Sequence, residues 1–166
     1  MLLFEFNDVF AKFSDAIEAK FGKRPQNMTD AEYEAAVSSL VRTDFYEKLA
    51  IEVLGWDMMK WGMTYRDREV GFILVNEAKS PSWVNSQKIA YMDKVCAQMG
   101  IVRLDFWTCR DLNELKAHAY RCPLISRNDK HRQVWDSAGK YRSVFLNDDM
   151  NITIQDVNRS FADYTP

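Results

Sequence analysis

A chain of 166 residues, with 47% hydrophobic and 28% charged residues, has the size and composition of a single soluble globular domain. Its net charge of −2 argues against nucleic acid as a partner, because proteins that recognise a phosphate backbone usually carry a basic excess. No apolar run approaches the ~20 residues of a membrane span, and the first residues lack the basic character of a secretory signal. We therefore expect a cytoplasmic protein with no membrane partner.

Three cysteines, Cys96, Cys109 and Cys122, form an odd set without a Cys-x-x-Cys pair. Such a set does not describe a disulfide framework, and reduced thiols are expected. A zinc site built from Cys109, His118 and Cys122 lacks the clustered spacing of zinc motifs, so ordinary thiols are the favoured interpretation.

The first clear structural signal is the apolar run at residues 2–6, whose four large hydrophobic side chains predict a buried central strand. The run stops at a polar cluster. Asp8 stands where a helix N-cap would precede apolar residues at helical spacing, and that helix is expected to end near Gly22. Ligand crevices of open α/β sheets lie beyond the carboxyl ends of the strands, so Glu5, Asn7 and Asp8 are expected at the rim of one. The alternative is that these residues only close the strand.

Two further helices are expected before residue 70. Thr29 and Glu32 form a capping box, in which a hydroxyl and a carboxylate satisfy backbone donors at the start of a helix. Another helical stretch begins near Asp44 and ends at Gly55 or Gly62, because glycine interrupts helices.

Residues 56–66 are the most aromatic and methionine-rich part of the chain. Interleaved with Lys60, Arg66 and Arg68, these rings could stack a nucleobase. A helix that packs its wide side chains on a sheet is the favoured interpretation.

From residue 70 onward, strands and helices alternate. Strands are predicted at residues 70–75, 101–107 and 143–146, and residues 124–131 lead into a helix. Alternation at this spacing predicts a single α/β domain over residues 1–166, with a mainly parallel sheet and right-handed crossovers. The helices between and after the strands are expected to end at Gly100, Ala119 and Ser137 and to include a final helix beyond Asp149.

The order of polar groups along these strands resembles that of the haloacid dehalogenase superfamily. The first strand ends on two positions that are acidic in that family, the second strand ends in a small polar residue, a lysine follows later, and the fourth strand ends on Asp148 and Asp149. Within that superfamily, the pattern resembles that of the small 5'(3')-deoxyribonucleotidases and related phage-type nucleotidases. The resemblance spans nearly the whole chain and implies a Rossmann-like three-layer core, a magnesium cofactor, and a helical cap inserted at approximately residues 10–68.

The first motif of that family departs from its pattern here. In the family, an aspartate attacks phosphorus and a second aspartate, two residues later, transfers the proton of the leaving group. Glu5 and Asn7 occupy these positions. A misplacement of ~1 Å from the extra methylene of glutamate can cost ~10²-fold in rate. An amide cannot transfer a proton, which removes a contribution of roughly 10²–10⁴. The family's phosphatase chemistry is therefore expected to be lost.

The resemblance also implies three residues that bind phosphate. The small polar residue of the second strand, which holds phosphoryl oxygens in the family, matches Asn76, or Val75 if the alignment slips by one. Lys130 matches the charge-neutralising lysine, and Lys88 resembles an additional phosphate contact. Lysine can balance a phosphate charge without any catalytic step.

The implied magnesium site consists of Glu5, Asp148 and Asp149, whose carboxylate oxygens are the hard ligands that magnesium prefers. The alternative for the two aspartates is that they cap the final helix and interact with its dipole.

Three functions follow from these observations. The first is a degenerate member of the superfamily that binds a nucleotide or phosphate ligand, or a protein partner that it regulates. The second is an active magnesium-dependent 5'-nucleotidase or phosphate-monoester hydrolase with an altered mechanism, such as a metal-bound water activated by Glu5. The third, nucleic-acid binding by residues 56–68, is the least expected because of the charge balance.

Overall fold

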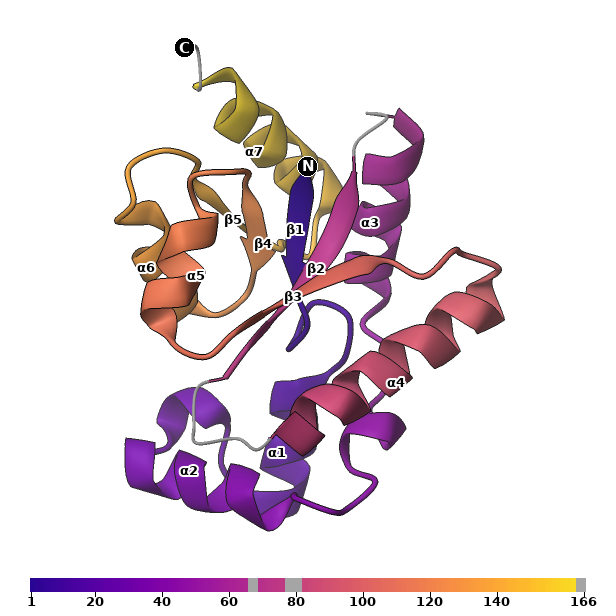
Figure 1. Ribbon diagram of the computed structural model, residues 1–166, viewed down its shortest axis with the longest axis vertical. Coiled ribbons are helices and arrows are strands. Elements are labelled where there is room, and N and C mark those ends of the chain that lie inside the picture. Colours follow the sequence, from indigo (N-terminus) through magenta and orange to yellow (C-terminus); the bar gives the residue numbers. More distant parts are fainter. Residues whose placement is uncertain (66–68, 77–81, 164–166) are drawn as a thin grey trace.

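The computed structural model describes residues 1–65, 69–76 and 82–163. Its centre is a five-stranded parallel sheet in the order β3-β2-β1-β4-β5 (Figure 1), so the first strand of the chain lies in the middle. β1 pairs with β2 from Leu2 opposite Val70, and with β4 from Leu3 opposite Leu124. The strands are β1 (Leu2–Glu5), β2 (Val70–Val75), β3 (Asp105–Cys109), β4 (Leu124–Ser126) and β5 (Ser143–Phe145).

Helices cover both faces of the sheet. Figure 1 shows α5 and α6 on one side, and α3, α4 and α7 on the other, which confirms the predicted α/β, Rossmann-like three-layer architecture. Within the described residues, no helix combines the length and the hydrophobicity that crossing a membrane requires. The helices are α1 (Phe13–Phe21), α2 (Asp30–Ser39), α3 (Val53–Tyr65), α4 (Ser82–Met99), α5 (Leu112–His118), α6 (Asp129–Asp136) and α7 (Met150–Ala162), with the short 3-10 helices η1 (Pro25–Asn27) and η2 (Tyr46–Lys48).

The pleat of β1 decides which way its side chains point, because successive residues of a strand face opposite sides of the sheet. Leu2 and Phe4 belong to the core under α3, α4 and α7, whereas Leu3 belongs to the core under α5 and α6. Glu5 is therefore on the same face as Leu3, toward α6. This alternation places a carboxylate inside a buried layer rather than at the sheet edge.

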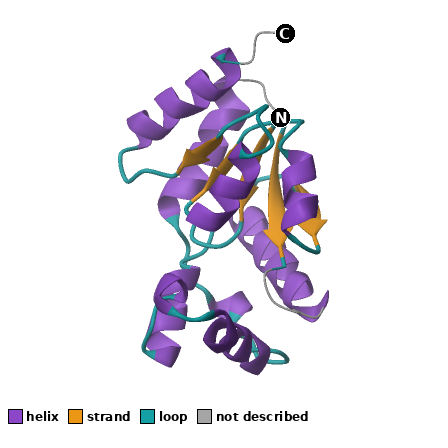
Figure 2. Ribbon diagram, turned by 90° about the vertical axis from the view of Figure 1, so that its left-hand side faces the viewer, coloured by secondary structure: helices purple, strands orange, loops and turns teal. Residues whose placement is uncertain are grey.

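Within residues 10–68, which the resemblance predicts as a cap, the described residues form two structurally different parts. The helices α1, η1, α2 and η2, which we call the cap, form a group of their own at one end of the molecule (Figure 2). α3, in contrast, contacts β1, β2 and α7 and belongs to the layer that covers the sheet. The chain enters and leaves the cap at adjacent points, since Lys12 N donates to Ala50 O at 2.9 Å and Glu52 N donates to Phe10 O at 3.0 Å.

Several predicted local signals are confirmed. The capping box of Thr29 and Glu32 has both of its hydrogen bonds. Gly22 and Gly100 follow α1 and α4 with positive φ, a conformation that a side chain rarely adopts. The aromatic segment is a helix packed on the sheet: Trp56 is buried and its indole N–H donates to Phe10 O at 3.0 Å. Arg66 and Arg68 lie outside the described residues.

The structure differs from the prediction in four places. The helix expected from Asp44 to Gly55 or Gly62 is replaced by the short η2 and by α3, which begins only at Val53. Asp8 is not the N-cap residue of a helix that follows it directly: α1 begins at Phe13, after Lys12, and the Asp8 carboxylate accepts from the first-turn N–H of Ser14 across the intervening segment. The third strand is β3 at residues 105–109 rather than 101–107, because it pairs with β2 from Gly71 opposite Asp105 onward. β4, which the sequence pattern did not predict, adds a fifth strand of only three residues.

Candidate functional site

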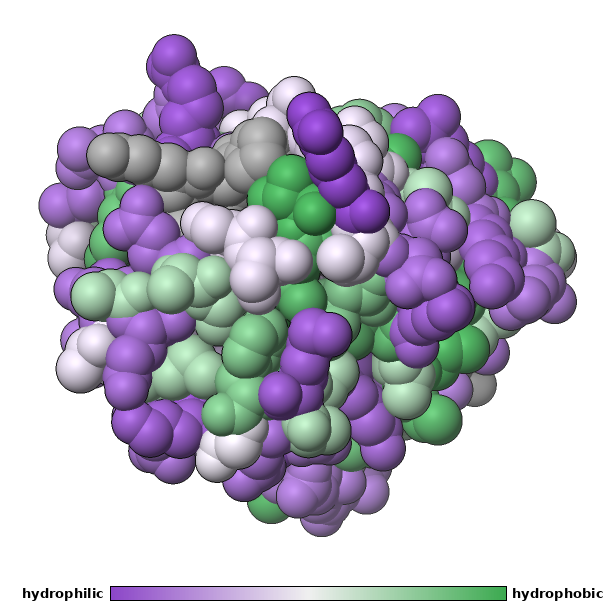
Figure 3. Space-filling model, turned by 90° about the horizontal axis from the view of Figure 1, so that it is seen from below, coloured by the Kyte–Doolittle hydropathy of each residue, from purple (hydrophilic) through white to green (hydrophobic). Residues whose placement is uncertain are grey.

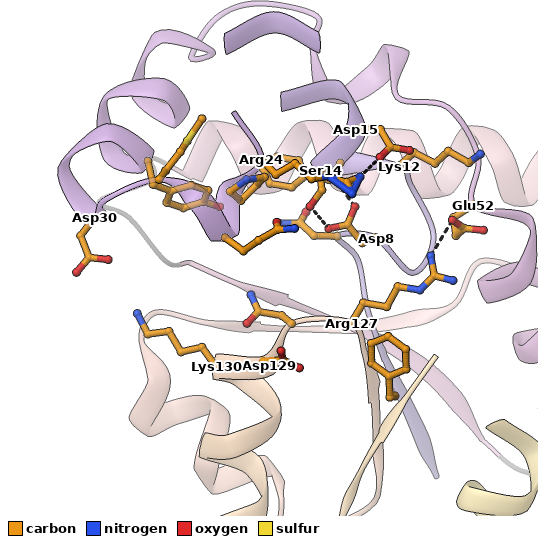
Figure 4. A pocket seen from close by; sticks show the side chains of 18 of the residues that line it. Asp8, Lys12, Ser14, Asp15, Arg24, Asp30, Glu52, Arg127, Asp129 and Lys130 are labelled. Atoms are coloured by element: carbon orange, nitrogen blue, oxygen red, sulfur yellow. Dashed lines mark hydrogen bonds and ion pairs between the residues drawn. The ribbon is translucent and has the colours of Figure 1, made fainter. Parts of the chain in front are cut away.

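A cleft of about 740 Å³ lies between the cap and the carboxyl ends of β1 and β4, where the sequence predicted the rim of a crevice. Figure 4 shows its two walls: Lys130 and Arg127 reach up from the β4–α6 side, and Asp8, Lys12 and Arg24 come from the opposite side. Among the described residues, six acidic and four basic side chains line the cleft. The acidic ones are Asp8, Asp15, Asp30, Glu34, Glu52 and Asp129, and the basic ones are Lys12, Arg24, Arg127 and Lys130.

Five of these ten side chains form ion pairs within the protein, and neither lysine is among them. Arg24 forms ion pairs with Asp15 and Glu18. Lys12 and Lys130, on opposite walls, are exposed, and within residues 1–65, 69–76 and 82–163 their ammonium groups have no ion pair or hydrogen bond. They are therefore the groups in this cleft that can take up an anion without first losing an internal partner.

Asp8 lies at the floor of the cleft in a constrained backbone conformation, with φ of 59°. Its carboxylate accepts hydrogen bonds from Ser14 N at 2.7 Å and from Ser14 Oγ at 2.5 Å, which fixes the start of α1 to the end of β1. Burial raises the pKa of Asp8 above its ordinary value of 3.8, and the hydrogen bonds from Ser14 oppose that shift.

We expect Asp8→Asn to raise Tm at neutral pH. A carboxyl whose pKa is raised by folding binds its proton more tightly in the folded state. The free energy of unfolding therefore decreases as pH rises above 3.8, and the full decrease is reached once pH exceeds the folded-state pKa. Asparagine removes that cost and tolerates a positive φ. Tm of both proteins, measured between pH 3 and 7, should converge at the acid end; an equal difference at every pH would contradict this account.

Glu5, the predicted nucleophile position, is held in a buried hydrogen-bond network. Its Oε2 accepts a hydrogen bond from Ser126 Oγ, and its Oε1 lies 2.7 Å from His131 Nδ1, whose N–H donates to it. Ser126 Oγ in turn accepts from Asn128 N at 2.9 Å. Glu5, Ser126 and His131 are 3%, 0% and 1% exposed, and Glu5 is not among the described residues that line the cleft. Both of its oxygens are thus already engaged.

Ser126 and His131 are site residues that the sequence did not predict. Ser126 ends β4 and His131 lies on α6, so both face the same buried layer as Glu5. The alternation of side chains along β1 could have indicated that Glu5 lies on the same face of the sheet as Leu3. Because β4 was not predicted, however, no hydrogen-bond partner for Glu5 could be assigned on that face.

The residues predicted to bind phosphate are not gathered at one place. Lys130 lines the cleft, but Lys88 and Asn76 are not among its described lining residues. Lys88 is buried, and its Nζ lies 5.3 to 6.0 Å from the centres of three aromatic rings, those of Phe6, Phe13 and Tyr46. Its ammonium group therefore joins α4 to the cap through cation–π contacts.

The side chains of the predicted magnesium site are also separated in their contacts. Asp148 is exposed and pairs with Arg127, whereas Asp149 is the N-cap of α7 and accepts from Asn151 N at 2.9 Å. The helix-capping alternative is thus confirmed for Asp149. In the described part of the chain, no three histidine, cysteine or acidic side chains are grouped to hold a metal ion. The residues do not fit the cofactor, and no step through magnesium is derived.

The alternative zinc set is equally unsuited. Cys109 and Cys122 are buried, and burial raises the pKa of these thiols to about 12 and about 11. Among the residues that the structure describes, these thiols and His118 are not grouped to hold a metal ion.

Comparison with known proteins adds no relative to these observations. No protein-family model matches the chain, and no curated protein matches it. The resemblance to the haloacid dehalogenase superfamily therefore depends on the order of its motifs and stays a prediction.

Proposed function

We propose that this protein is a degenerate haloacid dehalogenase-like binding module that holds a small phosphate-bearing ligand, such as a nucleotide, in the cleft between cap and sheet without hydrolysing it. The observation that carries the proposal is the state of Glu5. Its carboxylate is bound to Ser126 and His131 in a buried layer, so it cannot approach a phosphorus atom in the cleft.

Proton transfer is the second missing capacity. Asn7 lines the cleft at the position of the family's general acid, and an amide neither gives nor takes a proton there. Its Oδ1 is buried and accepts no hydrogen bond from the described residues. A buried acceptor of this kind favours a ligand with a hydroxyl or amine donor, because an unsatisfied polar atom is costly.

The charges of the cleft restrict the ligand. Lys12 and Lys130 offer two positive groups for one phosphate, while six acidic side chains disfavour a highly charged anion. Sugar hydroxyls and base amines can donate to those acidic groups. A nucleoside monophosphate therefore suits the cleft better than a triphosphate.

The test is a thermal-shift titration with a panel of nucleoside monophosphates, combined with a phosphate-release assay with and without Mg²⁺. Ligand at ~100 times its Kd adds about 2.7 kcal/mol, which for a chain of this size corresponds to roughly 5–10 °C in Tm. Lys130→Ala and Lys12→Ala should each weaken binding about tenfold, because each removes a charged donor. Lys94→Ala, an exposed lysine of α4 outside the cleft, is the matched control and should bind as the wild type does.

Phosphate release by the wild type would overturn the non-hydrolytic proposal and favour the altered hydrolase. Absence of any shift would overturn ligand binding and leave the protein-interaction form of the hypothesis. Protein interaction is favoured by the surface at the cap end of the molecule. There, hydrophobic and intermediate residues gather in the middle of the face and hydrophilic residues border them (Figure 3).

A further inference from the structure

The outer edge of β3 carries backbone groups that pair with no other strand. β3 is the last strand of the sheet on its side, and β2 is its one neighbour among the described strands. Cys109 O accepts from Asn76 N at 2.9 Å on the β2 side, and the direction of backbone groups alternates along a strand. Phe106 and Thr108 therefore direct their N–H and C=O groups outward. An edge of this kind is a template for pairing with a further strand.

There is room for a strand beside this edge. A hollow of about 490 Å³ is lined by Phe106, Trp107 and Thr108 and by residues of α5. Successive side chains of a strand point to opposite faces, so a hollow that all three consecutive residues line lies along the strand edge. The ring of Trp107 packs back over Gly71 of β2, where a Cβ would overlap it, and so leaves the edge uncovered. Figure 1 shows β3 in front of β2 and β1, with α4 and α5 on either side of it.

Two antiparallel copies of β3 match each other when they are centred on Trp107. In an antiparallel pair, residues that direct their N–H and C=O groups toward each other lie opposite and exchange two hydrogen bonds. The register that sets Trp107 opposite Trp107 of a second copy also sets Phe106 opposite Thr108 of that copy, and the two-fold axis repeats this pair. Every residue of β3 then has a partner, and every outward backbone group of the strand is hydrogen-bonded.

The charges at the two ends of β3 fit the same register. Asp105 begins the strand, is exposed, and shares the face of Trp107 by alternation. Arg110 follows the strand, is 86% exposed, and pairs with Glu114 of α5, so it is turned to that face as well. Antiparallel pairing brings Asp105 beside Arg110 of the second copy at both ends of the contact. This complementarity favours a second copy as the occupant, because the chain itself supplies both charges at the required spacing.

We propose that this protein associates with a second copy of itself by antiparallel pairing of the two β3 strands around Trp107, which joins the two five-stranded sheets into one. The contact is a short edge pair, so the association is weak and depends on protein concentration. It does not rest on any ligand in the cleft, because none of the described residues that line the cleft belongs to β3.

The first experiment is sedimentation equilibrium of the full chain between ~5 µM and ~1 mM, the range in which small interfaces associate. The mass of the wild type should rise from 19.4 kDa toward twice that value. Thr108→Pro removes an outward N–H that occurs twice in the symmetric pair and spares the bonds to β2, so Kd should rise at least about tenfold. Thr108→Val keeps the N–H and is the matched control, with the Kd of the wild type.

The charges are tested with Asp105→Arg, which sets like charges side by side at both ends of the contact. Its Kd should rise about tenfold at low salt and approach that of the wild type at high salt, because screening weakens the repulsion. A wild type that stays at 19.4 kDa over the whole range would overturn the proposal. So would association that Thr108→Pro leaves unchanged, since the copies would then meet through another face.

Hydrogen exchange of the wild type decides the matter if Thr108→Pro does not fold. The amides of Phe106 and Thr108 should exchange several-fold more slowly at high protein concentration than at low concentration, whereas the Trp107 amide, which is directed at β2, should not change. Exchange of the Phe106 and Thr108 amides that is the same at both concentrations would overturn the pairing of β3.

Discussion

Gly55→Ala is expected to destabilise the protein by about 3–5 kcal/mol, or roughly 10 °C in Tm. Gly55 is the third residue of α3, and a Cβ placed there would lie 1.7 Å from the carbonyl oxygen of Val9 and 2.6 Å from its carbonyl carbon. Both are backbone atoms of the segment between β1 and the cap, so no side-chain rotation relieves the overlap. Either α3 or that segment must move. Thermal unfolding followed by circular dichroism measures the effect.

Gly62→Ala, in the same helix, is the matched control. A Cβ there meets Val70 Cγ2 at 3.4 Å and Leu2 Cδ2 at 3.6 Å, which are ordinary contacts. Alanine also has the higher helix propensity, by about 1 kcal/mol, so this variant should be as stable as the wild type or more so. Similar losses in both variants would show that the approach of α3 to Val9 does not limit its packing.

Glu5→Ala should also cost about 3–5 kcal/mol, because it removes the common acceptor of a buried network. Ser126 Oγ and His131 Nδ1 would each lose the acceptor of a hydrogen bond while remaining buried. Glu47→Ala, an exposed carboxylate on η2, should change Tm by less than about 1 °C. Chemical denaturation with urea would report both free energies of unfolding.

A second variant distinguishes the destabilisation caused by unpaired buried groups from the stabilisation contributed by the intact hydrogen-bond network. Replacing all three members, as in Glu5→Leu with Ser126→Ala and His131→Leu, removes the buried carboxylate together with both of its donors and leaves only Asn128 N without its Ser126 acceptor, so it should recover most of the loss. An equally unstable triple variant would mean that the network itself, rather than its disruption, sets the stability of this layer.

The fold was largely accessible from the sequence because its main strands and helices carry strong signals. The apolar runs of β1 and β2 and the glycines after α1 and α4 mark their elements directly. β4 escaped prediction because three residues are too few to show a period. Its place beside β1 depends on tertiary pairing, which a local pattern does not contain.

For the candidate site, only the location could be predicted from the sequence. The carboxyl end of β1 borders a cleft that Asn7, Asp8 and Lys130 line, but Glu5, expected at the same rim, is not among its described lining residues. The sequence could not indicate that Glu5 would be bound by His131, since the two are 126 positions apart. It could not reveal the contacts of Arg127 either, because these depend on where Glu52 and the β5–α7 loop meet in space.

The central place of β1 in the sheet has a consequence for the order in which the protein can fold during synthesis. β1 can pair with β2 only after Val70 has been synthesised. It can pair with β4 only after Leu124 has been synthesised, about 120 residues after Leu3. Until then its hydrophobic side chains have no sheet to join, and a nascent chain with such a segment is prone to aggregation. The strand that organises the finished molecule is therefore the one that a chaperone would most usefully shield while the ribosome completes the chain.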